Sequence, residues 1–143
     1  MVALSAAKRA AYAKVLPRFW RAAADADARQ AEWFQQLVGK GNTIVLVSEV
    51  ALGIDGFAIG TLHSAPPVYD PGGLTCTIDD FCVREPSLWP TVGVALLDGV
   101  RAQARARGAS QVVVVCGMHD TAKRTMLDRP GLSLASHWFT GPA

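Results

Sequence analysis

The sequence predicts an α/β (α+β) domain built around a mixed β-sheet. Its first third is rich in alanine and helical in pattern, two β-rich runs separated by a glycine turn come next, and a strand–helix–strand unit follows them. The chain has 143 residues, of which 50% are hydrophobic and 18% charged, so it fits one globular domain with one core. Residues 1–143 are therefore expected to form a single domain.

Two helices and a β-hairpin are expected in the N-terminal half. Residues 6–16 and 27–38 have helical patterns, and they are followed by Pro17 and by glycines, which end helices. The run TIVLVSEV at 43–50 and the segment 57–63 are β-rich and flank a turn, which is typical of a hairpin.

The C-terminal half is expected to begin with a strand–helix–strand unit. The expected elements, in order, are a strand over 74–83, a helix over 91–107, a strand over 111–116, a short helix over 121–127 and a last strand over 132–139. The first three should form a right-handed crossover with parallel strands. The apolar run QVVVVC at 111–116 is typical of a strand covered on both faces. A proline- and glycine-rich loop over 64–73 precedes this unit and is long enough to carry function.

Composition and charge argue against several classes of protein. The net charge of +2, without a basic stripe, argues against nucleic-acid binding, and no apolar run is long enough to span a membrane. No long apolar segment follows the first residues, so no signal peptide is expected. Cys76, Cys82 and Cys116 form no CxxC motif, which indicates a reduced, cytoplasmic setting and no metal site.

Asp79 and Asp80 are unusual residues for an apolar strand. An unpaired carboxylate is costly to bury, and strand alternation should send the two side chains to opposite faces. Two structural explanations are open: Asp80 pairs with the backbone or an arginine and holds the fold, or the strand is splayed and Asp79 is solvated. The functional explanation is that one carboxylate attracts an ammonium substrate or relays its proton, with a pKa raised by burial.

The stretch from about Thr75 to Gly108 contains a strand that ends at Val83, a loop, and a helix that opens with Ala95-Leu96-Leu97. This spacing resembles motif A of the GNAT acetyltransferases, in which a strand ending in valine leads through a Q/R-x-x-G-x-G/A loop into an Ala-Leu-Leu helix. Gly93 stands at the second glycine of the loop, whereas Leu88 and Thr91 stand at the other two positions. The segment TAKRTMLDRPGL at 121–132 resembles the family's A-x-x-x-Y-x-k-x-G-F helix.

The resemblance implies the GNAT fold, with a mostly antiparallel central sheet and helices on both faces. It also implies acetyl-CoA or another acyl-CoA as cosubstrate, with pantetheine paired to the strand at 81–83 and pyrophosphate on the amides of 89–94. Pro90 removes one of these amide donors. The residues expected to contact acyl-CoA are Phe81, Cys82, Val83, Leu88, Trp89, Thr91, Val92, Gly93, Val94, His119 and Lys123. For Lys123 and Arg124 the simpler interpretation is an exposed helix charge.

The implied activity is an N-acetyltransferase in which a primary amine of a small molecule or peptide attacks the thioester directly. Asp79 is the first candidate to orient or deprotonate the amine, and Asp80 is the second catalytic candidate. Weaker candidates for the acceptor site are Glu49, His63 and Tyr69.

Two further expectations concern the C-terminal part of the chain. The family's general-acid tyrosine is replaced by Met126 or Leu127, so water or another group must protonate the CoA thiolate. Trp138 and Phe139 are expected in the core or on a homodimer surface. The competing hypothesis is a GNAT-fold protein that binds CoA or another ligand without turnover.

Overall fold

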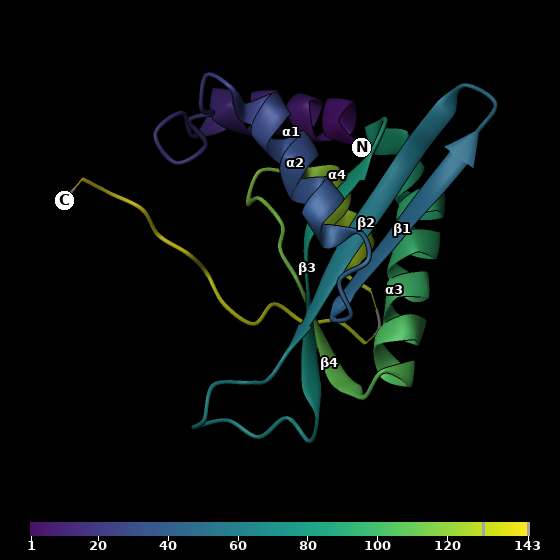
Figure 1. Ribbon diagram of the computed structural model, residues 1–143. Helices are drawn as coiled ribbons and strands as arrows, with labels where there is room; N and C mark the ends of the chain where they lie inside the picture. The colour runs from purple at the N-terminus through teal and green to yellow at the C-terminus, as the bar shows by residue number, and fades with distance from the viewer. Residues whose placement is uncertain (130, 143) are drawn as a thin grey trace.

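A four-stranded sheet forms the centre of the molecule. The computed structural model describes residues 1–129 and 131–142 (Figure 1). The strands are β1 (Thr43–Val50), β2 (Gly53–His63), β3 (Leu74–Val83) and β4 (Ala109–Val114), in that spatial order. The first three strands pair antiparallel, whereas β3 and β4 run parallel. The expected mixed sheet and its parallel crossover are confirmed.

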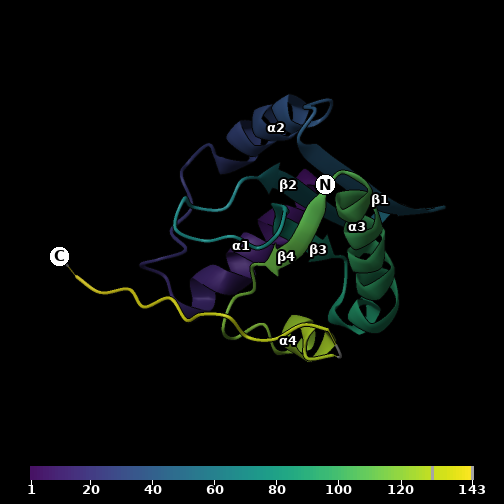
Figure 2. The same ribbon diagram turned by 90° about the horizontal axis from the view of Figure 1, so that it is seen from below.

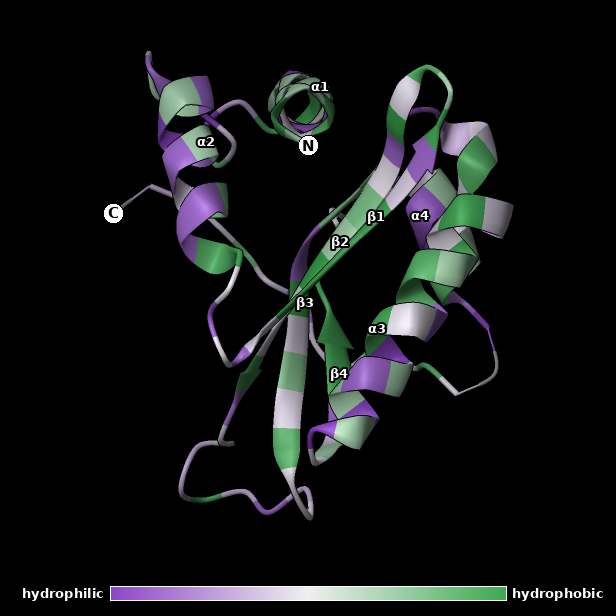
Figure 3. Ribbon diagram, turned by 45° about the vertical axis from the view of Figure 1, so that its right-hand side comes forward, coloured by the Kyte–Doolittle hydropathy of each residue, from purple (hydrophilic) through white to green (hydrophobic). Residues whose placement is uncertain are grey.

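Helices cover both faces of this sheet (Figures 2 and 3). One face carries α1 (Val2–Val15) and α2 (Ala26–Leu37), and the other carries α3 (Val94–Ala106) and α4 (Thr121–Leu127). Each helical layer encloses its own core. Phe34 of α2 packs with Phe57 on the first face, and Leu97 and Met126 pack with Ile78 on the second. Arg9 of α1 bonds Gln30 and Asp27 of α2 and ties the first layer together.

The start of the third helix differs from the expectation. The segment 84–90 was expected to be a loop, but a 3-10 turn (Pro86–Leu88) and a π-helical turn (Trp89–Gly93) lead directly into α3. Pro86 lies in the first turn, where a missing N–H is tolerated, and this favours an early helix start.

Two expectations about the sheet edge are wrong. Residues 132–139 form no strand: Trp138 and Phe139 are 86% and 94% exposed, and the tail extends away from the body (Figure 1). The run 111–116 was expected to be covered on both faces, and this is also wrong. No strand within the described residues pairs with the outer edge of β4, so β4 is an edge strand with half-buried and exposed residues. Tertiary pairing, not strand propensity, decides this point.

Candidate active site

Strands β3 and β4 separate partway along their length. Their pairing ends at Ile78 and Val114, and the last hydrogen bond runs from Val115 N to Ile78 O at 2.9 Å. Strand β3 continues to Val83, and there it pairs with β2 alone in the part of the chain that the structure describes. From Asp79 onward the backbone of β3 therefore has no partner strand on the β4 side within the described residues, and we call this break in the pairing the β3–β4 opening.

A β-bulge stands at the same point of β3. Ala58 pairs with Phe81 and Gly60 with Ile78, so Asp79 and Asp80 together lie opposite the single residue Ile59. The extra residue resets the alternation of side chains, and Ile78 and Phe81, three apart, enter the same core. Simple alternation of the two aspartates is thus interrupted by the bulge.

The two carboxylates have different surroundings. Asp79 is exposed. The Asp80 side chain is 22% exposed and reaches Lys8 Nζ at 3.9 Å and Gln30 Nε2 at 3.4 Å. Burial raises the pKa of Asp80, while Lys8 opposes the shift and Asp79 adds to it. Asp80 therefore has a lysine partner from α1, and Asp79 is the carboxylate open to a solute.

Lys123 lies inside the β3–β4 opening. The expectation of an exposed helix charge is wrong, because Lys123 is only 1% exposed. Its Nζ donates to Val115 O at 2.8 Å and to Phe81 O at 3.4 Å, and so connects the two separated strands. The ammonium lies 4.9 Å from the Phe81 ring centre and 5.5 Å from the Trp89 ring centre. Burial, with a contribution from Lys8, lowers the pKa of Lys123 to about 8.

Trp89 and Gly93 are joined by packing. The Trp89 indole is buried and meets Phe81 edge to face at 4.8 Å. A Cβ on Gly93 would lie 2.5 Å from the indole, so this position needs glycine for packing between turns. The resemblance assigned Gly93 to phosphate approach, and its packing is a second, structural reason for the residue.

Few amides of this helical segment are free for a phosphate. The Trp89 N–H donates to Pro86 O and the Val94 N–H to Trp89 O and Thr91 O, while Pro90 has no N–H. These bonds, together with Pro90, reduce the number of amide donors that the expected pyrophosphate-binding stretch can offer. That expectation stays a prediction, on a smaller set of donors. Leu88 lies in the 3-10 turn and is half-buried.

A groove of about 450 Å³ lies beside this segment. Pro86, Pro90 and Val94 line one side, and Ala122, Thr125 and Arg129 of the α4 region line the other. Arg129 Nη2 lies 3.7 Å from Asp98 of α3, whereas its Nη1 is buried with no partner within the described part of the chain. A guanidinium N–H of this kind suits an anionic oxygen.

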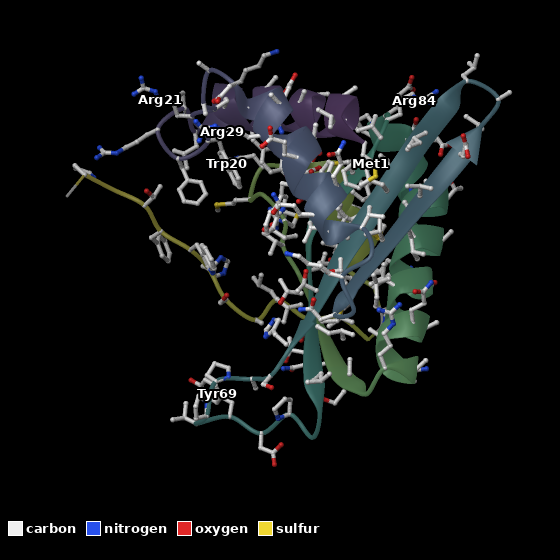
Figure 4. All side chains as sticks on the ribbon, in the orientation of Figure 1. Met1, Trp20, Arg21, Arg29, Tyr69 and Arg84 are labelled. Carbon is white, nitrogen blue, oxygen red and sulfur yellow. The ribbon has the colours of Figure 1, made fainter. Side chains whose placement is uncertain are left out.

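The structure leaves other candidate residues outside this site. Glu49 is exposed on edge strand β1, and His63 bonds Thr77 Oγ1 at 2.8 Å and Ser64 O at 3.0 Å near the start of β3. Tyr69 is 71% exposed in the loop before β3, whereas Arg84 marks the other end of that strand (Figure 4). His119 is exposed between β4 and α4. Glu49, His63 and Tyr69 are therefore not brought together with the aspartates.

Sequence reasoning missed the contribution of α1. Lys8 pairs with Asp80, and Tyr12 donates to Asp120 Oδ2 at 2.8 Å and accepts from Gly117 N at 3.2 Å. Burial first, and then Asp120, raises the pKa of the Tyr12 phenol. Lys8 and Tyr12 are four residues apart and so share a helix face. This spacing is the feature of the sequence that could have indicated their common role. Asp120 also caps α4, because its side chain accepts a hydrogen bond from Lys123 N at 3.2 Å.

Several features are not found in the described part of the chain. None of the helices within it is long and apolar enough to cross a membrane. The same residues contain no group of three or more histidine, cysteine or acidic side chains that could hold a metal ion.

Solved structures share the fold of this chain. A mutant of the BH1408 protein from Bacillus halodurans matches with a TM-score of 0.82 at 17% identity, over 99% of this chain and 90% of that chain. Glucosamine-6-phosphate N-acetyltransferase from Arabidopsis thaliana matches at 0.61 and 14% identity, over 94% and 90%. Aminoglycoside N-acetyltransferase AAC(6')-Iy, solved with CoA, matches at 0.66 and 11%, over 81% and 87%.

These likenesses are structural. No protein-family model and no curated protein sequence match the chain. At such identities the neighbours show the fold alone. The chain has the GNAT-like fold of these acetyltransferases.

Proposed function

We propose that the protein is an acyl-CoA-dependent N-acyltransferase that acylates a primary amine of a small molecule or peptide by direct attack. The observation that carries this proposal is the β3–β4 opening next to the Asp79–Asp80 bulge. Acyl-CoA would supply the activated acyl group as a thioester. The structural neighbours support this class of reaction, since they include acetyltransferases and one complex with CoA.

The residues present fit an acyl-CoA in two places. The groove with Arg129 suits the nucleotide end, because a guanidinium N–H favours a phosphate oxygen and Arg129 Nη1 has no partner among the described residues. The backbone of Phe81–Val83 suits the pantetheine arm and the thioester carbonyl, because no strand among the described residues pairs with β3 on that side. Thr91 and Val92, at the start of the helical segment that leads into α3, are the candidate amide donors for the pyrophosphate.

Asp79 is the residue we assign to the amine. It is exposed beside the opening, so its carboxylate can attract an ammonium ion and accept a hydrogen bond from it. Asp80, whose pKa is raised by burial, is the second acidic group and is held by Lys8. We assign Asp80 a supporting part in proton removal. Positioning and electrostatics carry most of this chemistry.

The test has a binding arm and a turnover arm. Thermal unfolding is followed with CoA and with acetyl-CoA, and thiol release is then measured with a panel of amines. We expect stabilisation by both compounds. We also expect kcat/KM to fall about 100-fold in Asp79→Asn, the range typical of a lost acid–base group. Glu49→Gln, an exposed acid on β1, is the matched control and should be unchanged.

A binding protein without turnover is the second candidate. The helical start of α3 and the Lys123 side chain within the opening favour it, because both reduce the room and the donors for the cosubstrate. Stabilisation by CoA with no thiol release on any amine would support this candidate. An unchanged unfolding temperature with both CoA and acetyl-CoA would contradict acyl-CoA use altogether.

A further inference from the structure

The amino group of Lys123 occupies the point where β3 and β4 part. Val115 is the last residue of the β4 side to bond β3, and Phe81 lies just past the bulge on β3. Lys123 Nζ contacts the carbonyl oxygens of both residues, at 2.8 and 3.4 Å. Any acyl group placed between these two backbones would therefore lie against this amine.

The surroundings of Lys123 favour its neutral, nucleophilic form. A neutral amine has two N–H groups and one lone pair, and the carbonyls of Val115 and Phe81 can accept both N–H groups. With a pKa of about 8, about a tenth of the side chain is neutral at pH 7, far more than for an ordinary lysine. The charged and titratable groups facing it are Lys8 from α1, Asp80 and Cys82 from β3, and Cys116 and Asp120 from the β4–α4 segment.

We propose that Lys123 is itself an acyl acceptor, and that its ε-amine takes the acyl group from a thioester bound in the β3–β4 opening. In this step the bond from Nζ to the acyl carbon forms and the carbon–sulfur bond breaks. The thiolate leaves and is protonated by the proton that the amine loses. The products are an Nε-acyl-lysine and a free thiol. The inference rests on the proposed function only in placing a thioester between β3 and β4.

The experiment maps acylation on the full chain. The protein is incubated separately with acetyl-CoA and with S-acetyl-N-acetylcysteamine, a small thioester without the nucleotide, and modified peptides are quantified by mass spectrometry. We expect acetylation of Lys123 at least 10-fold faster than that of the exposed Lys14 at pH 7.5. The rate at Lys123 should rise with pH and level off above about pH 8, whereas an ordinary lysine continues to gain reactivity beyond pH 10.

Two variants complete the design. Lys123→Arg keeps a cation and its donors but lacks the nucleophile, and it should lose the modification, while Lys14→Arg should retain it at Lys123. Thermal unfolding checks that both variants are folded, and the mapping of the unaltered protein does not depend on either of them.

The outcomes separate this inference from the proposed function. Unmodified Lys123 in both thioester arms overturns the inference, and CoA binding with amine turnover would still support the N-acyltransferase. Selective modification by the small thioester, without CoA binding or amine turnover, would support the inference and contradict the proposed function. Modification of Lys123 at the same rate as Lys14 would also overturn the inference.

Discussion

At the scale of single residues, Lys123 is the most informative side chain. A lysine that is 1% exposed loses its hydration, and the two carbonyl bonds and two aromatic faces offset only part of that loss. The lowered pKa of Lys123 reflects the part of the lost hydration that these contacts do not replace. The same residue is thus a cost to the folded state at neutral pH and a source of a reactive amine.

The first prediction concerns the pH dependence of stability. Between about pH 8 and the ordinary lysine value of about 10.5, the unfolded chain holds more protons than the folded one, so Lys123 makes stability rise with pH. Relative to Lys123→Met, the free energy of unfolding should rise by about 3 kcal/mol across this window. Urea unfolding at pH 7.5, 9 and 10.5 measures it. Lys14→Met, at an exposed position, is the control, and parallel curves for the protein and Lys123→Met would contradict the assigned burial.

At the scale of elements, α1 connects the β4–α4 segment to the rest of the site. Tyr12 of α1 bonds Asp120 and Gly117, and a Cβ on Gly117 would lie 2.7 Å from the Tyr12 ring. Lys8, one turn earlier, holds Asp80 of β3. The helix therefore contacts both sides of the β3–β4 opening.

The second prediction tests this connection. Tyr12→Phe removes a hydroxyl that donates to Asp120 and accepts from Gly117, and it leaves two partly buried partners less satisfied. We expect a loss of about 1–2 kcal/mol of stability in urea unfolding. Tyr69→Phe, which alters an exposed tyrosine, should change stability by less than about 0.5 kcal/mol. Equal losses of stability in the two variants would mean that the Tyr12 hydroxyl does not stabilise the packing of α1 on the β4–α4 segment.

At the scale of the whole molecule, two separate cores hold the two helical layers to one sheet. The α3 and α4 layer packs on one face and the α1 and α2 layer on the other (Figure 3). The β3–β4 opening interrupts the sheet between these layers.

The third prediction concerns the C-terminal tail. Leu134, Trp138 and Phe139 are 75%, 86% and 94% exposed, so they add little to the cores. Deletion of residues 134–143 should therefore change the free energy of unfolding by less than about 0.5 kcal/mol, as measured in urea. Leu132 packs against the larger core and is retained. A loss above about 1 kcal/mol would show that the tail packs against the domain in solution.

Much of the fold could be predicted from local pattern. The strand over 43–50, the strand over 74–83 and the short helix over 121–127 have the bounds that their residues indicate, because hydrophobic period and turn residues act locally. The parallel crossover followed from the element order. The acidic pair was also visible in the sequence, and its strand is where the sheet opens.

Only the tertiary structure decided the state of the side chains in the site and the fate of the last segment. The burial of Lys123, its bonds to Val115 and Phe81, and the contribution of Lys8 depend on elements distant in sequence, which no local pattern reports. Strand character at 132–139 required a partner edge, and the tail does not reach one. The sequence by itself thus determined the order and kind of most elements, because these depend on near neighbours. The β3–β4 opening, the buried amine of Lys123 and the unpaired edge of β3 depend on contacts between elements that lie far apart in the sequence.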